Sequence, residues 1–133
     1  MIPKFRAWVK TEKCFADYIE SIRFYINEID LCWGGICESD CFDFNDVILM
    51  QSTGFSDELG KELFEGDIIL WTYWDEFEDS GSAKIVFDKG MFKLLDIRTE
   101  KEVWDNLFDC IENCNVYLQG NIYENPELLE DKE

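Results

Sequence analysis

The chain has 133 residues, 47% of them hydrophobic and 16% aromatic, and a net charge of −18 from 30 acidic and 12 basic residues. This length is typical of one compact domain, so we expect a single domain over residues 1–133, and the apolar content argues against disorder. The acidic excess excludes direct nucleic acid binding and attachment to anionic membranes as expected functions, because both depend on lysine and arginine.

The sequence contains no segment typical of export or membrane insertion. Residues 1–10 lack the apolar stretch of a signal peptide. No run approaches the roughly 18 apolar residues that a membrane-spanning helix needs. We therefore expect a cytoplasmic protein with no membrane partner.

The first third of the chain predicts strands separated by polar segments. Residues 4–10 alternate basic and apolar side chains with a period of two, which predicts a half-buried strand, and 11–13 predict its turn. Residues 15–31 fit both strand alternation and helical spacing, and a strand is the favoured interpretation. Two glycines at 34–35 end this pattern, and the acidic residues 38–46 predict a loop.

The central part of the chain predicts four strands and several glycine turns. Glycine at 54, 60 and 66 supplies the positive φ angles of tight turns, and Asp57 and Asp67 are expected to accept hydrogen bonds from turn amides. Residues 75–82 predict an acidic loop, and Asp88-Lys89-Gly90 predicts a hairpin turn. The predicted strands are 47–51, 68–74, 83–87 and 91–97.

The last part of the chain predicts one helix and one strand. Apolar residues at helical spacing favour a helix over 102–114, with Thr99 as a possible N-cap. Residues 115–119 predict a strand, 120–123 a turn, and 126–129 one helical turn.

These elements together predict an α+β, β-rich fold. Its centre is a small, bent SH3-like β-barrel over about residues 47–123, preceded by the N-terminal strand and a variable segment within 1–46. One short helix and an acidic tail over 124–133 complete the expected domain. A barrel of this kind hosts many unrelated functions, so the fold does not decide the activity.

The composition argues against an enzyme. The absence of histidine excludes Ser-His-Asp and Cys-His catalysis, and no glycine-rich phosphate-binding motif occurs. No cofactor is therefore expected. Paired carboxylates keep an Mg²⁺- or Mn²⁺-dependent hydrolase open as an alternative.

The six cysteines are interpreted as buried free thiols, because cytosolic thiols stay reduced and cysteine behaves as a small hydrophobic residue. A zinc site and a disulfide are the alternatives. The cysteines are Cys14, Cys32, Cys37, Cys41, Cys110 and Cys114.

Three sequence blocks, in order, carry a family resemblance. They are Lys4-Phe5-Arg6-Ala7-Trp8, then Met50-Gln51-Ser52-Thr53-Gly54 continuing through Asp57, Gly60-Lys61-Glu62 and Glu65-Gly66-Asp67-Ile68, and finally Gly120-Asn121-Ile122-Tyr123-Glu124-Asn125-Pro126-Glu127-Leu128-Leu129. This pattern resembles the YopX family of phage and prophage proteins. Residues 14–46 and 98–114 fit no part of it. The resemblance implies a soluble protein of the host-cell cytoplasm, with a homo-oligomer as one open possibility, and it transfers no activity or catalytic residue.

The candidate binding residues come from these blocks. Each has a structural interpretation as well, namely packing for the aromatic residues and turn formation for the acidic ones. Turn formation and packing are the favoured interpretation, and a shared ligand-binding cluster of the acidic members is the alternative. The candidates are Phe5, Arg6, Trp8, Glu65, Asp67 and Glu124.

The leading functional hypothesis is a non-catalytic, acidic protein-interaction module that binds a host or phage protein. Its alternatives are a protein that sequesters a small nucleotide-like ligand in counter-defence, and the metal-dependent carboxylate enzyme. The acidic charge, the missing histidine and the family resemblance support the first.

Overall fold

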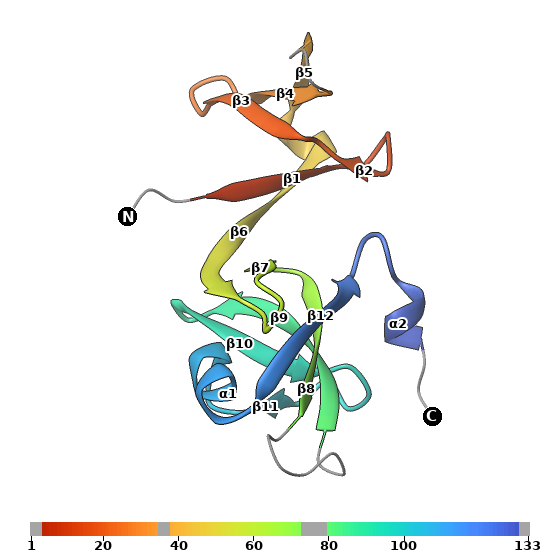
Figure 1. The fold of residues 1–133 in the computed structure, drawn as a ribbon. Coiled ribbons are helices and arrows are strands. Elements are labelled where there is room, and N and C mark those ends of the chain that lie inside the picture. The colour runs from red at the N-terminus through yellow and green to blue at the C-terminus, as the bar shows by residue number, and fades with distance from the viewer. Residues whose placement is uncertain (1–3, 35–37, 73–79, 131–133) are drawn as a thin grey trace. The chain divides into compact units, whose positions relative to one another are not determined.

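The structure is a computed structural model that describes residues 4–34, 38–72 and 80–130 (Figure 1). The chain forms two compact units, unit 1 over Met1–Gln51 and unit 2 over Ser52–Glu133. The expected single domain stays a prediction, because two structural units can still unfold in one cooperative transition.

Unit 1 contains two small antiparallel sheets. In the first, β1 (Phe5–Val9) pairs with β2 (Cys14–Phe15) on one side and with the first half of β6 (Val47–Ser56) on the other. The predicted N-terminal strand and its turn are confirmed. The second sheet has the order β3-β4-β5. Its strands are β3 (Tyr18–Arg23), β4 (Glu28–Trp33) and β5 (Glu38–Asp43), followed by the 3₁₀ turn η1 (Phe44–Asp46).

The core of unit 1 lies where β1 meets β4. Ala7 and Val9 of β1 pack with Ile29 and Leu31 of β4 and with Val47, and all five are buried. Ala7 and Val9 both face this core because side chains alternate along a strand.

Two predictions for unit 1 were wrong. The acidic segment 38–46 is not a loop, because six of its residues form β5 along β4. Acidic side chains suit such a strand, since β5 is at the edge of its sheet. The strand favoured over residues 15–31 is not continuous, because residues 24–27 form the turn between β3 and β4.

Unit 2 is built on a curled, five-stranded antiparallel sheet with the order β11-β10-β9-β8-β12 (Figure 1). The predicted β-rich fold with one short helix is confirmed, although the sheet itself begins at residue 67 and not at 47. The hairpin at 88–90 is also confirmed. The strands are β8 (Asp67–Thr72), β9 (Ser80–Asp88), β10 (Met91–Asp96), β11 (Glu102–Val103) and β12 (Asn115–Asn121).

Three smaller elements complete unit 2. They are β7 (Glu62–Phe64), which pairs with the second half of β6, and the helices α1 (Leu107–Asn113) and α2 (Glu127–Glu130). Within the described residues, neither helix has the length and apolar character needed to cross a lipid bilayer.

The helix predicted over 102–114 starts later than expected. Glu102 and Val103 pair with β10 as a strand, and Asn106, not Thr99, is the N-cap. The Asn106 Oδ1 atom accepts a hydrogen bond from the Asp109 backbone N–H at 2.9 Å. Residues 80–82, expected in a loop, belong to β9, while 75–79 lie outside the described residues.

The core of unit 2 contains two of the six cysteines. Cys110 and Cys114 are buried, and burial raises the pKa of both thiols, which makes them unreactive core residues. Cys14 and Cys41 are also free, as predicted, but neither is buried, because Cys14 is half-buried and Cys41 is exposed. The interpretation was wrong for Cys32, which is disulfide-bonded. Cys37 lies outside the described residues. The core consists of Leu63, Ile69, Ala83, Ile85, Leu94, Leu107, Cys110, Cys114 and Val116.

Gly66 occupies the turn that starts β8, and its φ angle of 88° confirms the predicted left-handed conformation. Its N–H donates to the Ile85 carbonyl at 2.8 Å, and its own carbonyl accepts from the Ile122 N–H at 2.9 Å. Gly66→Val should lower the free energy of unfolding by about 1–2 kcal/mol, because a β-branched residue is strained at this φ angle. Urea denaturation of this variant, with Gly66→Ala as the milder comparison, measures the effect. An unchanged valine variant would contradict this expectation.

Candidate functional site

The N-terminal candidates Arg6 and Trp8 come together on one face of β1. The Arg6 guanidinium carbon lies 4.7 Å from the centre of the Phe15 ring, and the Trp8 ring packs edge-on against the same ring at 5.0 Å. Trp8 is 8% exposed and Phe5 is 39% exposed. The predicted alternation of basic and apolar side chains placed Trp8 opposite the basic residues, but positions 6 and 8 of a strand lie on the same face. These contacts indicate a packing role.

Two of the acidic candidates, Asp67 and Glu124, meet at Asn121. Asp67 is paired with Asn121 across β8 and β12, and the Asn121 amide donates to the Glu124 Oε1 atom at 2.8 Å. The buried Asp67 accepts a hydrogen bond from the Phe64 N–H at 2.8 Å, as predicted for a turn residue. Glu65 is half-buried in the same turn. Among the described residues, no group of three histidine, cysteine, aspartate or glutamate side chains is placed to hold a metal ion.

Hydrogen bonds from the backbone to the Asn121 side chain stabilise the turn that follows β12. The Asn121 Oδ1 atom accepts hydrogen bonds from the N–H groups of Tyr123 at 3.0 Å and Glu124 at 2.8 Å. Asn125 packs directly on Gly120, where an added Cβ atom would lie only 2.8 Å from the Asn125 Cγ atom. The close packing of Asn125, and not a positive φ angle in the predicted turn at 120–123, therefore favours glycine at position 120.

Asp57 joins two distant parts of unit 2. Its Oδ1 atom accepts from the N–H groups of Leu59 at 3.0 Å and Lys61 at 2.8 Å, and its Oδ2 atom accepts from the Leu118 N–H at 2.9 Å. Burial by itself raises the pKa of Asp57, but the hydrogen bonds from these three N–H groups outweigh it and hold the pKa below its ordinary value. Asp57 thus bonds turn amides, as predicted, and also caps the free edge of β12.

An aromatic groove, which was not predicted, opens on unit 2 with a volume of about 300 Å³. It lies near the turn of the β9–β10 hairpin. Phe87 and Phe92 are paired across this hairpin, and their ring centres lie 5.0 Å apart. The Phe55 and Phe108 rings lie 5.9 Å apart. The groove is lined by Phe55, Met91, Phe92, Asn106, Leu107 and Phe108.

The helix beside the aromatic groove is acidic. Phe108 is 50% exposed, and Glu112 follows it by four residues and therefore lies on the same side of α1. Asp105 and Asp109 flank Phe108 in the sequence, and no lysine or arginine occurs from residue 102 to 131. We refer to Asp105, Asp109 and Glu112 as the acidic rim.

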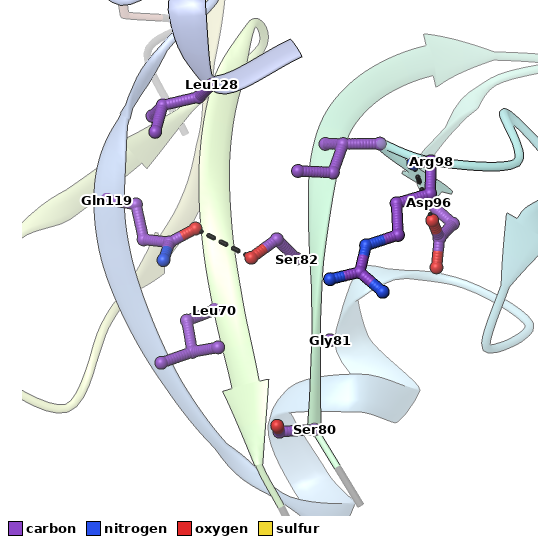
Figure 2. A pocket seen from close by; sticks show the side chains of 9 residues that line it. Leu70, Ser80, Gly81, Ser82, Asp96, Arg98, Gln119 and Leu128 are labelled. Atoms are coloured by element: carbon purple, nitrogen blue, oxygen red, sulfur yellow. Dashed lines mark hydrogen bonds between the residues drawn. The ribbon is translucent and has the colours of Figure 1, made fainter. Parts of the chain in front are cut away.

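A second groove of about 340 Å³, which we call the Arg98 groove, lies on another part of unit 2 (Figure 2). Figure 2 shows Leu70, Gln119 and Leu128 along one wall and Asp96 and Arg98 along the other. The Ser82 hydroxyl donates to the Gln119 Oε1 atom at 2.9 Å. The polar lining residues are Ser80, Ser82, Asp96, Arg98 and Gln119, and the larger apolar ones are Leu70, Ile97 and Leu128.

The β3–β4 hairpin of unit 1 exposes three apolar residues in succession, Phe24 by 73%, Tyr25 by 82% and Ile26 by 45%. We call these residues the apolar tip. Arg23 beside it donates to both carboxylate oxygens of Asp30, and these hydrogen bonds lower the pKa of Asp30 to about 2. The base of the tip is thereby held in place.

A family model and two solved structures each match almost the whole chain. A family model described as "YopX protein" matches residues 4–130. The chain is similar to the crystal structure of protein EF1440 from Enterococcus faecalis, with 29% identity, a TM-score of 0.65, and coverage of 97% of this chain and 99% of that one. It also shares the fold of YopX from Bacillus subtilis, with 18% identity, a TM-score of 0.62 and 97% coverage of each chain. No curated protein matches.

Proposed function

The chain belongs to the YopX family, and from this membership we propose that it is a phage or prophage accessory protein that acts as a non-catalytic interaction module. Its binding surface is the aromatic groove. The partner is a host or phage protein that presents an amphipathic, basic segment. Two properties of the groove support this proposal, namely its exposed aromatic side chains and the charge beside them.

The exposed aromatic side chains carry the proposal. Met91 and Phe108 line the groove and are 42% and 50% exposed. Phe87 does not line it, but its ring packs on the lining residue Phe92 and is part of a side chain that is 46% exposed. Aromatic residues and methionine are enriched at protein interfaces, where they provide most of the buried apolar area. A groove of this size accepts one or two large apolar side chains from a partner segment.

The charge beside the groove defines the partner further. The acidic rim repels acidic segments and attracts lysine and arginine, and the net charge of −18 adds a long-range attraction for a basic protein. A segment with apolar residues on one side and basic residues on the other therefore fits both features.

The proposal predicts that a synthetic amphipathic helix of leucine and lysine binds the groove. In an NMR titration of the full chain, this peptide should shift the Met91 methyl and Phe108 ring signals saturably. Phe108→Ser should weaken binding about tenfold, which corresponds to about 1.4 kcal/mol. Leu59→Ser is the matched control, because Leu59 is 71% exposed and does not line the groove. Added salt should weaken binding through screening.

Three outcomes would contradict the proposal. A leucine–glutamate peptide that binds equally well would remove the role of the acidic rim. An equal loss in the Leu59→Ser control would show nonspecific adhesion. Groove signals that shift with the concentration of the chain alone would instead assign the surface to contact between copies.

A further inference from the structure

We propose that the Arg98 groove binds a small organic molecule with one carboxylate and an apolar group. This site is separate from the aromatic groove and does not depend on the function proposed for it. The argument rests on the hydrogen-bond donors that face the groove, the local backbone that positions them and the balance of charge.

Arg98 supplies a positive charge that no residue in the described part of the chain neutralises. Within residues 4–34, 38–72 and 80–130, its guanidinium forms no ion pair and no hydrogen bond, although acidic residues outnumber basic ones by 30 to 12. The nearby Asp96 is engaged elsewhere, because its Oδ1 atom accepts from the backbone N–H groups of Arg98 at 2.7 Å and Thr99 at 3.2 Å. These bonds fix the loop that carries Arg98 and leave its side chain available to a ligand.

Gln119 supplies a second donor from the opposite wall (Figure 2). The pairing of β12 with β8 shifts register between Leu118 and Gly120, and a bulge of this kind re-aims the side chain of the extra residue. The Ser82 hydroxyl donates a hydrogen bond to the Gln119 Oε1 atom, which sets the orientation of the amide. The two Nε2 hydrogens of Gln119 then remain as donors. In the described part of the chain, these hydrogens have no acceptor.

These two donors, which have no acceptor among the described residues, are exposed on facing walls and favour a ligand rich in acceptors, and a carboxylate meets both with its two oxygens. A polyphosphate fits poorly, because the described lining residues offer one cation beside the carboxylate of Asp96 and the chain is strongly acidic. Leu70, Ile97 and Leu128 offer apolar surface for the rest of the molecule. The volume of about 340 Å³ is at the lower end for ligand sites, which limits the ligand to the size of a small metabolite.

N-acetylleucine is the probe that tests this site, because it joins a carboxylate to an apolar side chain, and N-acetylleucinamide is its neutral counterpart. In NMR titrations of the full chain, N-acetylleucine should saturably shift the Arg98 Nε–H and Gln119 side-chain amide signals. The neutral amide should bind at least about tenfold more weakly. Arg98→Gln should reduce affinity by a similar factor, whereas Lys101→Gln should leave it unchanged, because the exposed Lys101 does not line the groove.

The proposal is overturned by equal binding of the two probes, by full affinity in Arg98→Gln, by an equal loss in Lys101→Gln, or by the absence of a saturable shift. A longer peptide that ends in the same leucine carboxylate and binds more tightly would overturn the assignment to a free small molecule. Signals of Met91 and Phe108 report on the aromatic groove, so failure here is distinguishable from failure of the proposed function.

Discussion

Replacing Asp57 with alanine should lower the free energy of unfolding by about 3 kcal/mol or more. The substitution removes the acceptor of three backbone N–H groups, those of Leu59, Lys61 and Leu118, in a residue that is only 7% exposed. A hydrogen bond to a charged group contributes about 1.5–3 kcal/mol, and a buried donor left without an acceptor adds its own cost. The stability of Asp57→Asn should lie between those of the natural chain and Asp57→Ala, because asparagine keeps one acceptor oxygen. Urea denaturation measures all three proteins.

The pH dependence of stability separates the charge of Asp57 from its shape. Its folded-state pKa lies below the ordinary value of about 3.9, so the charged form stabilises the fold above about pH 4. That contribution is lost as the pH falls through the folded-state pKa. The stability gap between the natural chain and Asp57→Asn should therefore narrow below about pH 4. A gap that stays constant would show that the charge makes no contribution, and the exposed Asp88→Ala is the control for general loss of acidic charge.

Trp8→Ala should destabilise unit 1 by about 3–5 kcal/mol, the range for removing a large buried aromatic side chain. Trp8 lies on the central strand of its sheet, between β2 and β6, and is packed against Phe15. Arg6→Ala should cost about 0.5–1 kcal/mol, because Arg6 contacts the same ring through a cation–π interaction. Lys4→Ala, at an exposed position, should change stability by less than about 0.5 kcal/mol.

Hydrogen exchange read by mass spectrometry localises the effect of Trp8→Ala. Faster exchange in β1, β2 and the first half of β6 is the expected result, and unchanged exchange there would disprove the packing role. Peptides of unit 2 answer a second question. If they lose protection to the same extent, the two units unfold together, as the single-domain prediction requires.

Local patterns predicted the fold well where neighbours in sequence are also neighbours in space. The alternation at residues 4–10 and the Asp88-Lys89-Gly90 turn each determine a local element, and both were confirmed. The prediction of a loop over 38–46 was wrong because an acidic composition is typical of loops, whereas the pairing of this segment with β4 depends on tertiary structure. The predicted start of the helix was wrong because Glu102 and Val103 pair with β10 instead of extending α1.

The candidate site was harder to predict. The family blocks identified Asp57 and Asp67, and both bond turn amides as expected. Each groove combines residues from distant segments, such as Phe55 with Phe108 or Arg98 with Gln119, so no local pattern indicates it. Arg98 also lies in a segment that fits no family block. The exposed Phe108 was the one available signal, since it departs from the apolar face of its helix.

The apolar tip bears on how the protein behaves in a concentrated suspension. Three adjacent exposed apolar side chains form a small apolar patch on every copy, and such patches favour self-association. Near neutral pH the net charge of −18 makes copies repel one another before their tips meet. This barrier disappears near the isoelectric point of about 4.1. The acidity therefore favours colloidal stability, because the mutual repulsion of copies keeps their exposed apolar tips apart.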